Sequence, residues 1–120
     1  MLYDIQTMKP VSKLPHERDF QRWCAHMSAS DFQAAVSRID QMISGDEIHT
    51  AGWMPGNDWS GTPFAPIAAA CGGNPYQSGQ FFGLLVFYTV MQREVAWGFG
   101  KYTKNGVPIH SMTYFRLKNM

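Results

Sequence analysis

The chain has 120 residues, of which 45% are hydrophobic and 16% charged, and its net charge is +1. This length and composition predict one folded domain with a real core and exclude a disordered chain. The charge balance excludes a strongly basic nucleic-acid-binding domain, and a count of two cysteines excludes a disulfide framework.

The apolar segments are too short to cross a bilayer. The longest, FFGLLVFYTVM, has 11 residues, whereas a transmembrane helix needs about 20. The first residues, MLYDIQTMKP, lack the charged-then-apolar pattern of a signal peptide, so we expect a cytoplasmic protein. Because interface cores are depleted in charge, the scarcity of charge beside 14% aromatic residues also leads us to expect a homodimer. The alternative interpretation is a monomer with a well-filled core.

The first third of the chain carries two amphipathic helical patterns. Residues 1–14 show no clear period and are expected to form an N-terminal arm before a single domain over residues 15–120. Pro15 suits the first position of a helix whose apolar face would hold Phe20, Trp23, Cys24 and Met27. A second helix should be capped by Ser30 with Gln33 and end at Gly45; its apolar stripe comprises Phe32, Ala35, Val36, Ile39, Met42 and Ile43.

The middle of the chain predicts a loop followed by two helices. Residues 46–61 hold three glycines, a proline and two tryptophans, which is typical of a loop, with a short strand over 48–51. A short helix over 63–71 should end at a pair of glycines, and a long helix should begin at Asn74 and Pro75 and run to Arg93. The second half of this helix is apolar nearly all round, so it must be covered on most sides.

The last segment predicts an antiparallel β-hairpin, because Asn105 and Gly106 supply the two positive-φ residues of a tight turn. The register counted from this turn places Gly98 opposite Thr113, with Gly100 on the same face. The other face collects an aromatic ridge of Trp97, Phe99, Met112 and Tyr114. We expect the glycine face to lie against the glycines of the long helix, which leaves the ridge for the core or for a subunit interface.

From residue 31 onward, this order of elements resembles that of winged helix-turn-helix proteins. PFAPIAAAC would be the positioning helix, GGN the turn and PYQSGQFFGLLVFYTVM the recognition helix, followed by strand, wing tip and strand in AWGFGKY, TKNG and VPIHSMTYFRL. The resemblance implies that the recognition helix enters the major groove with its first residues while the wing contacts the backbone. Bases would face Tyr76, Gln77, Ser78 and Gln80, and phosphates would face Lys101, Lys104 and Arg116. Unlike that family, this recognition helix has no Lys or Arg before Arg93.

Two further resemblances concern single stretches. GDEIHTAGWMPGNDWSGTPF and WGFGKYTKNGVPIHSMTYFR look like parts of short uncharacterised bacterial proteins, including integron cassette proteins of mobile genetic elements. This resemblance implies a bacterial accessory protein and no activity. GFGKY also partly matches the aromatic strand of the RNA-recognition motif, but Trp97 stands where that motif has a basic residue.

The loop before the short helix is the candidate small-ligand site. Aromatic rings with a few placed polar groups are typical of ligand pockets, and here they are His49, Trp53, Asn57, Asp58 and Trp59. The alternative interpretation is that the two tryptophans cap the core. Asp46, Glu47, His49 and Asp58 match no metal-loop spacing, so we predict neither a metal nor a cofactor.

Nucleophilic catalysis would require a cysteine beside a histidine. Cys24 lies on an apolar stripe and Cys71 at a helix C-terminus, where the helix dipole opposes a thiolate. The sequence therefore favours an α+β binding protein over an enzyme, with about four helices, a C-terminal hairpin and a winged-helix-like order. Its expected target is nucleic acid or another protein; the alternative is a small-ligand module or minor enzyme built on the tryptophan loop.

Overall fold

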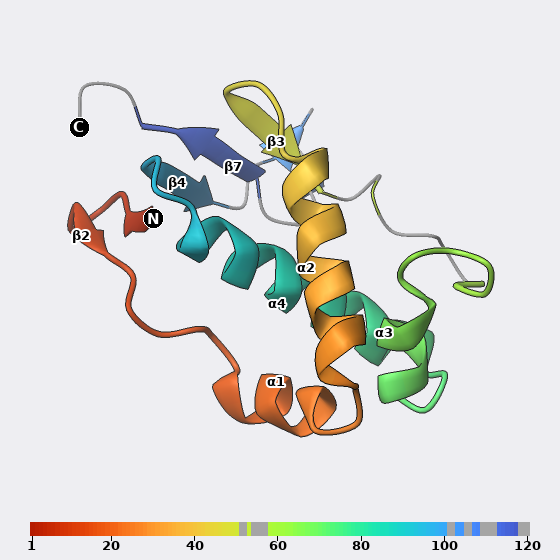
Figure 1. The fold of residues 1–120 in the computed structure, drawn as a ribbon. Coiled ribbons are helices and arrows are strands. Elements are labelled where there is room, and N and C mark those ends of the chain that lie inside the picture. Colours follow the sequence, from red (N-terminus) through yellow and green to blue (C-terminus); the bar gives the residue numbers. More distant parts are fainter. Residues whose placement is uncertain (51–52, 54–57, 101–102, 105–106, 109–112, 118–120) are drawn as a thin grey trace.

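Strands from three separate parts of the chain form one mixed five-stranded sheet (Figure 1). The computed structural model describes residues 1–50, 53, 58–100, 103–104, 107–108 and 113–117. The sheet has the order β2–β1–β4–β7–β3, with bounds β1 (Leu2–Asp4), β2 (Lys9–Pro10), β3 (Glu47–His49), β4 (Trp97–Gly100) and β7 (Thr113–Arg116). β1 and β4 are parallel, and the other neighbours are antiparallel. The α+β class is confirmed, but the sheet is more than a C-terminal hairpin.

The N-terminal segment belongs to the sheet, so the expectation of a separate arm over residues 1–14 is wrong. Leu2 pairs with Trp97 and Tyr3 with Gly98, across 95 residues of sequence. The side chain of Leu2 is buried in the core. Three-residue strands carry too short a pattern to be recognised from periodicity, and their pairing partner lies at the far end of the chain.

Four helices begin and end close to their sequence signals: α1 (Glu17–Cys24), α2 (Ala29–Met42), α3 (Ala65–Ala70) and α4 (Pro75–Gln92). The α4 cap is confirmed, because Asn74 Oδ1 accepts a hydrogen bond from the Gln77 amide at 3.1 Å. The expected cap of α2 is wrong by two residues, since Ser28 rather than Ser30 accepts from the Asp31 amide, at 3.0 Å. The expected start of α1 at Pro15 is also early.

The apolar faces predicted for α1 and α2 both contribute to the core. From α1, Trp23 is buried and lies 5.6 Å from Phe81 of α4 between ring centroids. From α2, Ala35 and Ile39 are buried as well. α4 itself buries nine side chains and lies in the middle of the helical layer, in contact with all three other helices. None of the helices in the described part of the chain is both long and apolar enough to span a membrane.

The C-terminal strands follow the predicted register near the turn and a shifted one farther away. At the tip, β5 (Thr103–Lys104) and β6 (Val107–Pro108) pair as the Asn-Gly turn predicts. Nearer the core, Gly98 pairs with Phe115 instead of Thr113. The reason is that two residues separate β4 from β5, whereas four separate β6 from β7. A shift of two residues keeps each side chain on its face, so the predicted division between glycine and aromatic faces holds.

The helical layer covers the aromatic face of the sheet, which overturns the expectation that the glycine face meets α4. Phe87 of α4 lies 5.3 Å from the ring of Phe99 and 6.5 Å from that of Tyr114. Gly83 of α4 is exposed, and nothing lies within 4 Å of where its Cβ would be. The helices pack on the aromatic face because burying its side chains removes far more apolar area from water than burying two glycines would.

Candidate functional site

The start of α4 presents an uncharged polar surface. Tyr76 is the most exposed of the large apolar side chains described, at 76%, and Gln80 is exposed one turn later. Gln77 is half-buried. Ser78 is fully buried and its hydroxyl donates to the Asn74 carbonyl at 2.7 Å. Of the four residues predicted to face bases, Tyr76 and Gln80 are therefore exposed, Gln77 is half-buried and Ser78 faces the interior.

The residues predicted to face phosphates are only partly described. Arg116 ends β7, and its Nη1 lies 3.3 Å from the Asp46 carboxylate, so its charge is partly balanced within the chain. Lys104 lies in β5, and Lys101 lies outside the described residues. α4 contributes no cation of its own over Pro75–Gln92.

Of the residues predicted for the tryptophan-loop site, the structure describes His49, Trp53, Asp58 and Trp59, and Asp58 and Trp59 line one hollow. Trp59 is buried and packs edge-on against Phe82, 6.0 Å away between ring centroids, while Trp53 is half-buried. A hollow of about 270 Å³ lies beside Trp59, lined by Asp58, Trp59, Ser60, Ala65, Ala68, Gly73, Pro75 and Ser78. Neither His49 nor Trp53 lines it, and Asn57 lies outside the described residues.

Asp58 is the charged group at that hollow. Its Oδ1 accepts hydrogen bonds from the hydroxyl and, at 3.0 Å, from the amide of Ser60. These two bonds favour the carboxylate and lower the pKa of Asp58. The hollow therefore presents an anion held in a turn next to a buried indole.

His49 of β3 contacts one residue of β7 and one of its own strand. Its Nδ1 lies 3.2 Å from Thr113 Oγ1, and its Nε2 lies 3.6 Å from Glu47 Oε1. His49 and Thr113 are directly opposite in the β3–β7 register, and Glu47 is two residues from His49 on the same face. Thr113 is fully buried, so its hydroxyl is shielded from solvent.

Both free thiols are at least partly buried: Cys71 is buried and Cys24 is half-buried. Burial raises the pKa of Cys71 above its usual value, and burial does the same for Cys24. A thiol with a raised pKa carries little thiolate near neutral pH.

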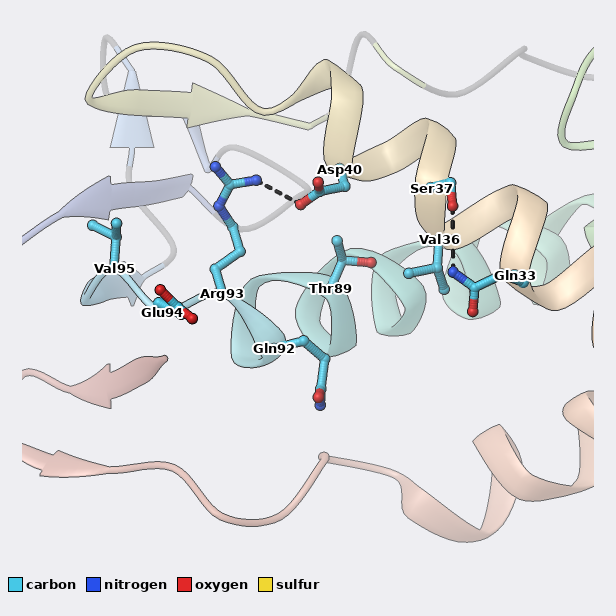
Figure 2. Close-up of a pocket in the computed structure, with 9 residues that line it drawn as sticks. All are labelled: Gln33, Val36, Ser37, Asp40, Thr89, Gln92, Arg93, Glu94 and Val95. Carbon is cyan, nitrogen blue, oxygen red and sulfur yellow. Dashed lines mark hydrogen bonds and ion pairs between the residues drawn. The ribbon is translucent and has the colours of Figure 1, made fainter.

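A groove that sequence reasoning missed lies between α2 and the end of α4 (Figure 2). Its volume is about 480 Å³, and its lining consists of Gln33, Val36, Ser37, Asp40, Thr89, Gln92, Arg93, Glu94 and Val95. Arg93 Nη1 lies 2.6 Å from Asp40 Oδ1, which ties the end of α4 to α2. The polar positions on α2 recur at helical spacing and were visible in the sequence. Their meeting with Arg93, 53 residues later, was not.

The residues predicted as a subunit interface lie mostly inside the chain. Trp97 and Tyr114 are each 2% exposed, and Phe99 packs on Phe87. Met112 lies outside the described residues. Comparisons of the chain with models of protein families, with curated proteins and with solved structures find no match.

Proposed function

We propose that the protein is a winged-helix-like, non-enzymatic binding protein that contacts nucleic acid with the start of α4. The observation that carries the proposal is the exposed side of α4's first turns, where Tyr76, Gln77 and Gln80 lie. Four residues join α3 to α4, and the order α2, β3, α3, α4, β4, β7 supports the same assignment. The proposal leaves out Ser78, because its side chain is buried.

The chemistry of this surface favours contact with base edges over phosphates. A glutamine amide both donates and accepts, as the edge of an adenine requires, and a tyrosine ring stacks on or packs against bases. We assign the phosphate contacts to Lys101, Lys104 and Arg116, which follow β4 in the sequence. Because the net charge is only +1, we expect a modest affinity with few released counterions.

The test is fluorescence anisotropy of labelled duplex and single-stranded DNA at about 50 and about 200 mM salt. Gln80→Ala should weaken binding by about 1–3 kcal/mol if the amide reads a base, and Tyr76→Ala should weaken it as well. Gln33→Ala, an exposed glutamine on α2, is the matched control and should bind like the wild type. An absence of binding by the wild type at low salt would remove the proposal.

We also propose that the protein acts as a homodimer in the bacterial cytoplasm. The low charge content supports self-association. The two stretches that resemble parts of short bacterial proteins support a bacterial origin. Light scattering over a range of protein concentrations tests the dimer independently of nucleic acid. A monomer mass at every concentration would contradict it.

A second candidate, a small-ligand module, is supported by the hollow beside Trp59. Its volume of about 270 Å³ lies just below the usual range for ligand pockets, and the Asp58 carboxylate favours a small cation. Thermal shift with small organic amines tests it. Asp58→Asn should abolish any shift, while Asp31→Asn, an exposed carboxylate on α2, should leave the shift unchanged.

A further inference from the structure

The β3 edge of the sheet carries unpaired backbone groups. Among the strands that the structure describes, β3 has one neighbour, β7, and the Arg116 amide donates to the Asp46 carbonyl at 2.7 Å. In an antiparallel pair, residues alternate between facing the neighbour and facing away, so Ile48 bonds to β7 while Glu47 and His49 point their N–H and C=O groups outward. No partner for these four groups occurs in the described part of the chain.

The opposite edge of the sheet is protected. β2 has only two residues there, and Pro10 has no N–H to donate. β3 has no proline, and the side chains of Glu47 and His49 are 60% and 54% exposed. A strand edge of this kind is a template for another strand.

We propose that β3 pairs with β3 of a second copy of this chain, antiparallel and about a two-fold axis at Ile48. Glu47 of one copy then lies opposite His49 of the other, and each such pair exchanges two backbone hydrogen bonds. This pairing is self-complementary, as a two-fold interface requires. It joins the two sheets into one and would form the interface of the proposed homodimer. This inference therefore rests on the homodimer proposed above.

Side-chain chemistry selects this register. Glu47 and His49 project on the same face of β3, and directly opposite groups on paired strands interact most strongly. The antiparallel pairing sets each carboxylate opposite an imidazole, whereas a parallel in-register pairing would set carboxylate against carboxylate. Within one copy, Thr113 Oγ1 lies 3.2 Å from His49 Nδ1, while His49 Nε2 lies 3.6 Å from the carboxylate of Glu47. Three residues make a short interface, so the dimer should dissociate on dilution.

Charge variants test the pairing. One variant, Glu47→Lys with His49→Lys, carries two cations at the edge, and a second, His49→Glu, carries two anions. Each should be monomeric alone because like groups then face each other, and an equimolar mixture should form a heterodimer. Arg38→Glu, on the exposed side of α2, is the control and should dimerise like the wild type. Sedimentation from about 10 µM to about 1 mM measures the masses, with circular dichroism to verify folding.

The outcomes separate this inference from the homodimer on which it depends. A wild type that stays monomeric overturns both. Dimers that persist in each variant alone overturn the β3 pairing and leave the homodimer standing, as do monomeric, folded variants that fail to associate when mixed. If a variant does not fold, amide exchange in the wild type decides: the Glu47 and His49 amides should be protected at high concentration and exchange faster on dilution, while the Lys9 amide should not change. Equal exchange of the Glu47 and His49 amides at both concentrations overturns the pairing.

Discussion

The ring of Phe115 lies over Gly98, its partner across the β4–β7 pair. A Cβ at position 98 would lie 2.5 Å from Phe115 Cε2 and 2.9 Å from Ile5 Cγ2. Gly98 is therefore the residue that lets an aromatic ring and the N-terminal segment lie flat on the outer face of the sheet. The helices, in contrast, pack against the aromatic face on the other side of the sheet.

Gly98→Ala should destabilise the fold by about 1–3 kcal/mol, because the added methyl group overlaps the Phe115 ring. Urea unfolding followed by far-UV circular dichroism measures the free energy. In a Phe115→Ala background the same change should cost less than about 0.5 kcal/mol, since Ile5 is exposed and can move. Equal costs in both backgrounds would show that the ring is not responsible.

Gly83→Ala should have the opposite effect and raise the free energy of unfolding. Gly83 lies inside α4 with open space at its Cβ position, so alanine gains helix propensity without a clash. We expect stabilisation by about 0.5–1 kcal/mol, seen as a higher midpoint in thermal unfolding. A destabilised variant would mean that another element approaches α4 at this point, as the sequence alone led us to expect.

Ser28→Ala should cost about 1 kcal/mol, because it removes the acceptor for the Asp31 amide at the start of α2. Ser30→Ala is the matched control: Ser30 is exposed within the first turn, and its loss should change the free energy of unfolding by less than about 0.5 kcal/mol. Chemical denaturation of both variants compares the two serines. The reverse ranking would place the cap at Ser30.

Stability should fall at alkaline pH because of Tyr114. Burial raises the pKa of its phenol above the usual value, so the folded protein keeps the proton that the unfolded chain releases. The stability contributed by the neutral phenol is full below the unfolded pKa of about 10 and is lost as pH rises above it, by up to about 1.4 kcal/mol per pH unit. Urea midpoints between about pH 9 and about pH 11.5 measure this slope. Tyr114→Phe should show a shallower slope by that amount; an unchanged slope would assign the effect to other groups.

Sequence reasoning located the candidate sites unevenly. It identified the start of α4 from the Asn74 cap, and Tyr76 and Gln80 there are exposed in the structure. It could not tell that Ser78 is buried, since burial depends on what packs beside the helix. The groove at Asp40 and Arg93 was missed for the same reason.

Local sequence signals determined most of the secondary structure of this protein. The helical periods, the cap of α4 and the Asn-Gly turn act over a few residues, so they could be identified from the chain alone, together with the division of β4 and β7 into two faces. The tertiary structure decided which face the helices cover, where Leu2 inserts and which strand edge has no neighbouring strand among the described residues. These depend on contacts between distant segments, where the burial of apolar area selects among arrangements that local geometry allows equally.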